Sequence, residues 1–278
     1  MRSKFLLIFV LIILCSLISA GNIASNVYSA EPEFDSPEGV EADSSGNVFV
    51  TDTFNNRIQK FSDTGTYIRK WGSEGTGNGQ FMSPFGVAVD SSGSVFIVDT
   101  NNNRIQKFSD IGAYIRKWGS VGNGNGQFSV PFGVAVDSSG NVFIADTLNN
   151  RIQKFSDNGT YIRKWGSLGT GKGQFDFPVG VAVDPSGNVF VADTLNNRVQ
   201  KFSSTGIFIT EWGSKGSGNG QFSFPLDIAV DSSGNVYVAD SANNRIQKFS
   251  DTGTFIRKWG TFGPLIMTLG TQSSDPFS

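Results

Sequence analysis

A 47-residue repeat dominates the sequence. The string NNRIQKF stands at residues 55–61 and returns unchanged at 102–108, 149–155 and 243–249, with NNRVQKF at 196–202. The same spacing separates five aspartates and five tryptophans, namely Asp52, Asp99, Asp146, Asp193 and Asp240, and Trp71, Trp118, Trp165, Trp212 and Trp259. The units are 34–80, 81–127, 128–174, 175–221 and 222–268. A fixed period of this length indicates an array of identical supersecondary units.

Each unit contains four short strand-forming segments. In the third copy they are GVAVD (133–137), NVFIAD (141–146), RIQKF (151–155) and YIRKW (161–165). The first two are continuously apolar, which fits inner strands covered on both faces, and the last two alternate apolar with polar residues, which fits strands nearer the rim. Turns rich in Gly, Asn and Asp separate them. Four antiparallel strands in about 47 residues predict one blade of an all-β propeller.

The repeat resembles a known family. The pattern P-x-G-V-A-V-D-x-S-G-N-V-F-V-A-D-T-x-N-N-R-I-Q-K-F-S-x-x-G-x-Y-I-R-K-W-G is similar to the NHL repeat, and it covers residues 34–260 in five successive copies. The resemblance implies a β-propeller of five four-stranded blades. The chain departs from the family at the motif's own name, because Asn55-Asn56 and four equivalent pairs stand where the family usually has Asn-His. The sequence contains no histidine.

Five units raise the question of how the ring is completed. Six blades are common in the family that the repeat resembles, but the residues after Trp259 do not begin a sixth unit. Two bare blade faces would cost on the order of 10 kcal/mol, because apolar burial contributes about 25 cal/mol per Å2. We therefore expect five blades to close on themselves, with a six-bladed or partner-completed ring as alternatives. The apolar segments 264–270 and 22–28 could each add a strand at the seam.

The first 30 residues differ from the repeats. MRSK carries two positive charges, and Phe5 to Ala20 is almost wholly apolar, which is typical of a signal peptide. The apolar run is shorter than the roughly 20 residues that span a bilayer, so we expect a cleaved signal, with a retained N-terminal anchor as the alternative. The predicted organisation is a leader (1–30), a propeller (31–268) and an irregular tail (269–278). The mature domain would be secreted or extracytoplasmic and not inserted in a membrane.

Charge and cysteine content argue against several partners and chemistries. Without the two basic residues of the leader, 20 basic residues face 24 acidic ones, which argues against a nucleic-acid partner. Cys15 is the only cysteine and lies in the leader, so the mature chain would lack thiol chemistry and disulfides. We expect no cofactor.

Several motifs that could carry chemistry have structural explanations. Asp146 and Arg151, five residues apart across a turn, predict an ion pair inside the blade. Linkers such as GTGNGQF lack the helix and Lys of a phosphate loop, and DSSGN lacks the acidic positions of a calcium loop, so both predict turns. Asn158 begins an Asn-Gly-Thr triplet, which is a candidate for N-glycosylation in an exported protein.

Functional residues are expected where the copies disagree at one mouth of the propeller. The linkers, the residue x of TxNN and the entry to the innermost strand would open on that face. The predicted ligand-binding residues are Glu38, Phe54, Phe85, Asn101, Phe132, Leu148, Lys172, Val179, Leu195, Leu226 and Asp227. Glu38 and Asp227 would be neighbours if blade five closed on blade one, and they are weak candidates for a cation site. The alternative is that both are relaxed repeat positions at the seam.

These residues lead to two functional hypotheses. The first is a non-catalytic scaffold that binds a protein, peptide or glycan, as a monomer or a partner-completed ring. The second, implied by the resemblance, is a calcium-dependent enzyme similar to lactonases or lyases, with Glu38 and Asp227 at its channel. Zinc-binding lyases of this fold use histidines, which are absent here. The scaffold is therefore favoured, and RNA binding or ubiquitin-ligase association is disfavoured by the acidic balance and by the lack of a Cys/His cluster.

Overall fold

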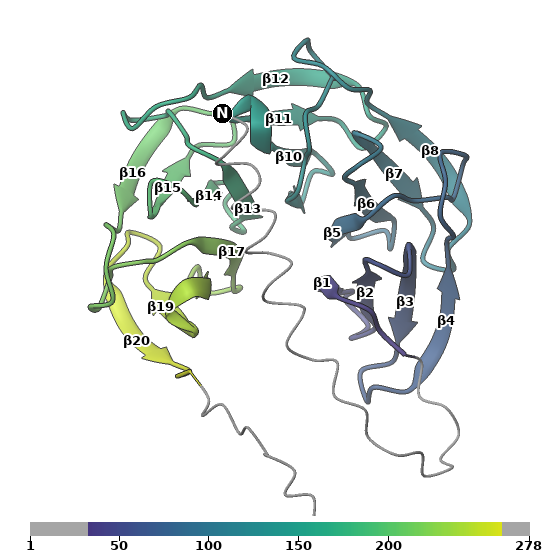
Figure 1. The fold of residues 1–278 in the computed structure, drawn as a ribbon, viewed down its shortest axis with the longest axis horizontal. Helices are drawn as coiled ribbons and strands as arrows, with labels where there is room; N and C mark the ends of the chain where they lie inside the picture. Colours follow the sequence, from purple (N-terminus) through teal and green to yellow (C-terminus); the bar gives the residue numbers. More distant parts are fainter. Residues whose placement is uncertain (1–32, 263–278) are drawn as a thin grey trace, which may run out of the picture.

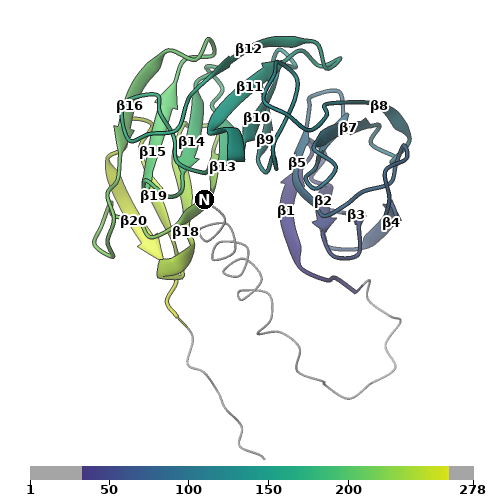
Figure 2. The same cartoon turned by 45° about the horizontal axis from the view of Figure 1, so that its top comes forward.

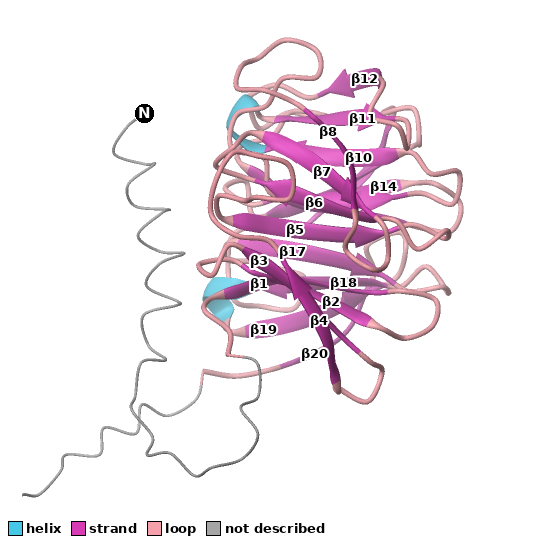
Figure 3. Cartoon of the chain, turned by 90° about the vertical axis from the view of Figure 1, so that its right-hand side faces the viewer, coloured by secondary structure: helices cyan, strands magenta, loops and turns pink. Residues whose placement is uncertain are grey.

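The computed structural model describes residues 33–262 as five four-stranded antiparallel sheets arranged as the blades of a propeller (Figure 1). The strands are β1 (Pro37–Ala42), β2 (Val48–Asp52), β3 (Arg57–Phe61) and β4 (Tyr67–Trp71) in blade 1; β5 (Pro84–Val89), β6 (Val95–Asp99), β7 (Arg104–Phe108) and β8 (Tyr114–Trp118) in blade 2; β9 (Val134–Val136), β10 (Val142–Asp146), β11 (Arg151–Phe155) and β12 (Tyr161–Trp165) in blade 3; β13 (Pro178–Val183), β14 (Val189–Asp193), β15 (Arg198–Phe202) and β16 (Phe208–Trp212) in blade 4; and β17 (Pro225–Val230), β18 (Val236–Asp240), β19 (Arg245–Phe249) and β20 (Phe255–Trp259) in blade 5. Two short 3-10 turns, η1 (Thr147–Asn149) and η2 (Ser241–Asn243), follow β10 and β18 on the same face (Figure 3).

The strands of each blade follow one another in sequence order from the centre to the rim, which confirms the predicted blade. Tight hairpins make this possible. In blade 3 the Asp137 carboxylate accepts hydrogen bonds from the backbone N–H of Ser139 and of Asn141, at 2.9 and 2.8 Å. Gly140 follows with a φ of 81°, which favours glycine. DSSGN is thus a hairpin turn, as predicted.

In blades 2 to 4 the third strand is more buried than its alternating sequence suggests. Every residue of β11 is buried, including Arg151, Gln153 and Lys154. These polar side chains are buried because each finds partners: the Lys154 ammonium, for example, lies 3.2 Å from the carbonyl oxygen of Ser204 and over the ring of Phe143. In the outermost strand of this blade, β12, the three central residues are exposed and the two ends, Tyr161 and Trp165, are partly buried. Alternation therefore reflects buried hydrogen bonding in β11 and solvent exposure in β12.

Apolar clusters between consecutive blades form the core. At the first interface, Phe49 and Ile58 of blade 1 pack against Phe81, Val87 and Phe108 of blade 2. The same arrangement recurs between blades 2 and 3, 3 and 4, and 4 and 5. We call the face that covers the next blade the forward face and the opposite one the rear face. Each blade thus depends on its neighbours to bury its two apolar faces.

The ring of described residues is open between blade 5 and blade 1. Consecutive inner strands pack from β1 through β5, β9 and β13 to β17, but no comparable packing joins β17 to β1 within residues 33–262. Figures 1 and 2 show the interruption between the first blade (purple) and the last (yellow). The prediction that five blades close directly on themselves is therefore wrong for this part of the chain. We call the unpaired forward face of blade 5 and rear face of blade 1 the seam.

Some predicted segments lie outside the described residues. They are the leader (1–30), the segments 22–28 and 264–270, the end of the fifth unit beyond residue 262, and the tail (269–278). Between residues 33 and 262, no helix has the length and apolar character needed to cross a membrane.

Candidate ligand-binding face

The repeated Asp and Arg form a buried structural ion pair. Arg151 Nε lies 2.6 Å from Asp146 Oδ2, and Asp146 is completely buried. The same carboxylate accepts hydrogen bonds from Asn149 Nδ2, Gln153 Nε2 and the backbone N–H of Ser129. The remaining guanidinium nitrogens donate to carbonyl oxygens of the preceding glycine-rich linker. The predicted ion pair is confirmed, and its partners show that it anchors the linker between two blades.

In blades 1 to 4, the second Asn of the NNR motif joins its blade to the next one. Asn103 and Asn150 adopt φ angles of 52° and 51°, in the left-handed region that asparagine tolerates. Their side-chain oxygens accept the backbone N–H of Val130 and Phe177, each at 2.8 Å. Val130 and Phe177 themselves have φ angles of 48° and 61°. Two residues that avoid this backbone conformation are thus held in it by the asparagine of the preceding blade.

An apolar cluster gathers at this mouth, which we call the mouth cluster. Phe132, Phe177 and Val179 are buried, and the rings of Phe132 and Phe85 lie 4.7 Å apart in an edge-to-face arrangement. The complete cluster is Phe85, Val130, Phe132, Leu148, Phe177, Val179, Leu195 and Leu226. The structure thus brings together six predicted residues from the strand entries and the TxNN turns.

Val130 and Phe177 were missing from the predicted face. They stand immediately before the proline that opens the inner strand, where the five copies read Ser36, Ser83, Val130, Phe177 and Phe224. This disagreement between copies is the signal that could have found them. Their positive φ angles, which the sequence did not reveal, belong to the turn that brings them to the mouth.

Other predicted residues do not join the mouth cluster. Phe54 is half exposed, and Asn101 instead donates a 2.9 Å hydrogen bond to Ser83 Oγ. The Lys172 ammonium lies 5.5 Å from the ring centre of Phe208 in β16, an outermost strand. The structure thus places Lys172 beside a rim strand and outside the mouth cluster, and its role in ligand binding stays a prediction.

Glu38 and Asp227 belong to opposite walls of the seam. Glu38 accepts a 3.0 Å hydrogen bond from Ser36 Oγ, and Asp227 accepts one of 2.9 Å from the backbone N–H of Ile228. Partial desolvation by the surrounding strands raises the pKa of both carboxyls above their ordinary values. Between residues 33 and 262, no group of three or more His, Cys, Asp or Glu side chains suited to a metal ion occurs. The two carboxylates therefore do not form part of such a group.

Glu41 is a carboxylate that the sequence analysis missed. It occupies the position of Ala88, Ala135 and Ala182 in other blades, so repeat divergence again carried the signal. Desolvation raises the pKa of Glu41 to about 7, a hydrogen bond from the backbone N–H of Ala42 opposes the shift, and repulsion from the Asp227 carboxylate adds to it. Glu41 pairs with Phe49, which packs against blade 2, so Glu41 lies on the forward face of blade 1 and not on the seam.

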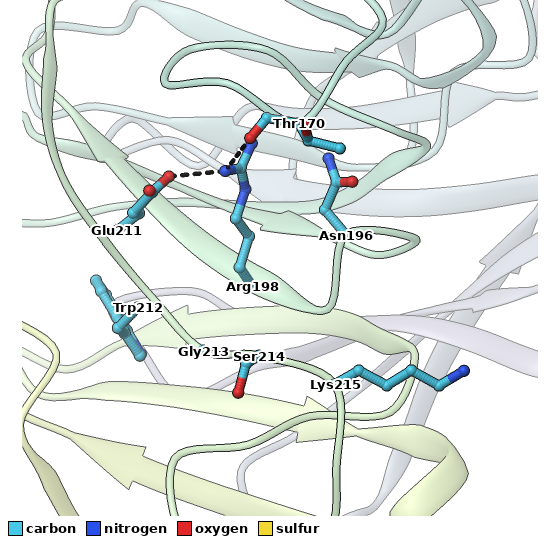
Figure 4. A pocket seen from close by; sticks show the side chains of 8 residues that line it. All are labelled: Thr170, Asn196, Arg198, Glu211, Trp212, Gly213, Ser214 and Lys215. Carbon is cyan, nitrogen blue, oxygen red and sulfur yellow. Dashed lines mark hydrogen bonds and ion pairs between the residues drawn. The ribbon is translucent and has the colours of Figure 1, made fainter.

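A polar pocket of about 520 Å3 lies beside the linker after blade 4 (Figure 4). Glu211 points towards Arg198, and their side chains meet at 2.8 Å. The other four blades carry lysine at the position of Glu211. Asn196 lines the pocket and follows Leu195 of the mouth cluster, so one turn contributes to both features. Thr170, Trp212, Gly213, Ser214 and Lys215 complete the lining.

Asn158 is exposed in the turn before β12. Its side-chain oxygen accepts a 2.7 Å hydrogen bond from Thr160 Oγ1, which is the hydroxyl of the same triplet. Glycosylation at this residue stays a prediction.

The fold is similar to that of several solved propellers. A streptogramin B lyase matches with a TM-score of 0.63 and 18% identity, over 82% of this chain and 70% of the lyase. A virginiamycin B lyase from Staphylococcus aureus gives 0.62 and 18%, over 82% and 71%. A chain of a nidogen/laminin complex gives 0.63 and 19%, over 81% and 80%. At these identities the likeness concerns the fold alone.

Sequence comparison assigns the family. No match was found among curated proteins. The family model for the NHL repeat matches five times, at residues 34–61, 81–108, 128–155, 175–202 and 222–249, in phase with blades 1 to 5. Each match contains the asparagine pair, the Asp-Arg ion pair and the first three strands of its blade. The chain therefore belongs to the NHL-repeat family.

Proposed function

We propose that this protein is an exported, non-catalytic scaffold that binds a protein or peptide at the mouth cluster, with a glycan as a further ligand class for the polar pocket. The observation that carries the proposal is the pair of apolar residues, Val130 and Phe177, in left-handed backbone conformation at the mouth. Such a conformation costs a non-glycine residue about 1 to 2 kcal/mol. Blades 1 and 2 have serine at this position, so the repeat fold does not require an apolar side chain there.

The chemistry of the mouth suits binding. Its side chains are apolar and aromatic, and Val130, Leu148 and Leu195 are only partly buried, so they can still gain contacts from a ligand. Recognition sites typically combine such apolar surface with a few placed polar groups. Asn196 follows Leu195 of the mouth cluster and lines the polar pocket, whose further polar groups are Glu211 and Lys215. A peptide with an apolar side chain for the mouth and polar groups for the pocket matches this face.

Peptide and glycan arrays test this proposal. We expect the mature chain to retain peptides with exposed aromatic or aliphatic residues, and the double variant Val130→Ser, Phe177→Ser to lose them. Phe224→Ser is the matched control, because Phe224 has the same backbone conformation (φ 51°) but is not part of the mouth cluster. Equal retention by both variants would contradict binding at the mouth. Export is tested by N-terminal sequencing of the secreted chain, which should begin after the leader.

A calcium-dependent enzyme similar to lactonases or lyases is the alternative. Its support is the fold likeness to streptogramin B and virginiamycin B lyases, with Glu38 and Asp227 as the candidate channel carboxylates. Calorimetric titration with calcium, followed by assays on lactones and on streptogramin B antibiotics, distinguishes the two. Turnover that is lost in Asp227→Asn would favour the enzyme over the scaffold.

A further inference from the structure

The two walls of the seam are blade faces without a partner. Val40 on the rear face of blade 1 is 67% exposed, whereas its equivalents Val87, Val134 and Val181 are at most 8% exposed. Phe34 is 42% exposed, whereas its equivalents in blades 2 to 5 are completely buried. On the forward face of blade 5, Trp259 is 43% exposed. The seam therefore presents apolar surface on both sides.

The surroundings of the turn glycines give independent evidence that blade 5 does not pack against blade 1. A Cβ atom on Gly112 would lie 2.7 Å from the ring of Trp71 in the preceding blade, and Gly159, Gly206 and Gly253 meet their preceding tryptophans at similar distances. Gly65 in blade 1 has no atom within 4 Å of that position. Trp259, which would cover Gly65 in a closed ring, is therefore not there.

Asp227 prevents blade 5 from packing against blade 1 in the way that the other blades pack against their neighbours. A Cβ atom on Gly39, Gly86 or Gly133 would lie 2.2 to 2.4 Å from a carbonyl oxygen of the following blade, so these interfaces require glycine. Blade 5 has Asp227 at this position, where a Cβ atom and a carboxylate would meet the Glu38 backbone and carboxylate of blade 1. The same mismatch would arise if a second copy of this chain offered its blade 1 to the seam.

Lys248 at the seam lacks the backbone acceptor that its equivalents have. Lys60, Lys107, Lys154 and Lys201 all donate to a carbonyl oxygen in the following blade. Lys248 has no such acceptor within residues 33–262, and its ammonium lies 3.8 Å from the Asp231 carboxylate of its own blade. The acceptor that Lys248 lacks is thus a peptide carbonyl.

The carboxylates of the seam indicate which charge a bound segment should carry. Glu38 stands on the blade 1 wall and Asp227 on the blade 5 wall. Neither carboxylate makes an ion pair with a basic residue between residues 33 and 262, whereas the buried aspartates of the blades do. A lysine or arginine brought between the walls would compensate these charges.

We propose that the seam between blade 5 and blade 1 is a docking site for an extended, basic polypeptide segment of another protein. The segment would supply apolar residues for the two walls, a peptide carbonyl for Lys248, and a lysine or arginine between Glu38 and Asp227. The inference deepens the proposed scaffold function by naming a second site and the chemistry of its partner. A second copy of this chain fits less well, because its first blade would add the Glu38 carboxylate to a wall that already carries Asp227.

Thiol labelling tests whether the seam is accessible. In a Cys15→Ser background the mature chain has no other cysteine, so Val40→Cys reports on the seam and Val87→Cys, at the equivalent buried position, is the matched control. We expect Val40→Cys to react at least 100-fold faster than Val87→Cys in the free protein, and sedimentation to show a monomer at all concentrations. Equally slow labelling, or a concentration-dependent oligomer that protects Val40→Cys, would overturn the proposal, because the chain or its copy would then occupy the seam.

Binding is measured with two fluorescein-labelled probes, the dodecapeptides (Val-Lys)6 and (Val-Glu)6. We expect the lysine peptide to bind 1:1, to protect Val40→Cys and to bind at least tenfold more weakly to the double variant Glu38→Gln, Asp227→Asn. The control Glu74→Gln, Asp110→Asn, which removes two exposed carboxylates elsewhere, should change affinity less than twofold. Absence of binding, equal binding of both peptides or equal effects of both double variants would overturn the proposal. The Val130→Ser, Phe177→Ser variant should still bind the lysine peptide, so failure at the seam and failure at the mouth are distinguishable.

Discussion

Arg151 Nε and Asp146 Oδ2 lie 2.6 Å apart in a buried site, and the equivalent pairs of the other four blades lie 2.6 to 2.8 Å apart. Each arginine also holds the linker that enters its blade. The pair thus joins the second and third strands of one blade to the chain arriving from the preceding blade.

Removal of this arginine should destabilise the protein. Arg151→Ala leaves the Asp146 carboxylate buried without its cation, which costs about 3 to 5 kcal/mol and lowers the Tm by roughly 10 °C. Arg163→Ala is the control, because Arg163 lies on an exposed rim strand and donates to the carbonyl of Thr205; its Tm should change by at most a few degrees. Thermal unfolding followed by circular dichroism measures both. Loss of ligand binding in Arg151→Ala without a lower Tm would contradict a structural role.

Replacing a turn glycine by alanine should destabilise the protein more where a tryptophan covers the turn than at the open seam. Gly112→Ala introduces a Cβ atom 2.7 Å from Trp71 at a φ of 77°, so strain and a steric clash add together. Gly65→Ala at a φ of 82° suffers only the strain, about 1 to 2 kcal/mol. Denaturant unfolding should therefore show a clearly larger loss for Gly112→Ala. Equal losses would mean that a tryptophan also covers Gly65.

The second asparagine of NNR should stabilise the fold through both its backbone conformation and its side-chain hydrogen bond. Asn150→Gly keeps the left-handed conformation but leaves the N–H of Phe177 without its acceptor, which costs about 1 to 3 kcal/mol. Asn150→Ala adds the strain of alanine at a φ of 51° and should be the less stable of the two. Urea unfolding measures the order. Equal stability of the two variants would show that backbone conformation at residue 150 has no influence.

Glu41 should make stability depend on pH in the direction opposite to that of a paired carboxylate. Its pKa in the folded protein is raised from 4.5 to about 7. Between these values the folded state binds more protons than the unfolded state, so stability is highest below pH 4.5 and falls as the pH rises towards 7. Glu41→Gln should remove this decrease and raise the Tm more at pH 8 than at pH 5. Because the side chain is exposed, we expect a gain of a few degrees at most. An equal change at both pH values would contradict the shifted pKa.

The sequence alone predicted the local architecture, because each blade is formed by contacts within one repeat. The four strands of blade 3, the DSSGN hairpin and the Asp146-Arg151 pair all involve residues fewer than 35 positions apart. Repeat periodicity and strand alternation report on such short-range structure. Repeat divergence also identified six of the eight residues of the mouth cluster.

Only the tertiary structure decided how the blades combine. Whether blade 5 meets blade 1 depends on inter-blade packing, which no single repeat encodes, and the expected closure is not formed between residues 33 and 262. The positive φ angles of Val130 and Phe177 depend on hydrogen bonds from the preceding blade, and Lys172 lies at the rim because the linker starts there. The sequence by itself determined the blade and its five copies, while the tertiary structure decided which divergent residues meet and which faces stay bare, because these depend on contacts between repeats.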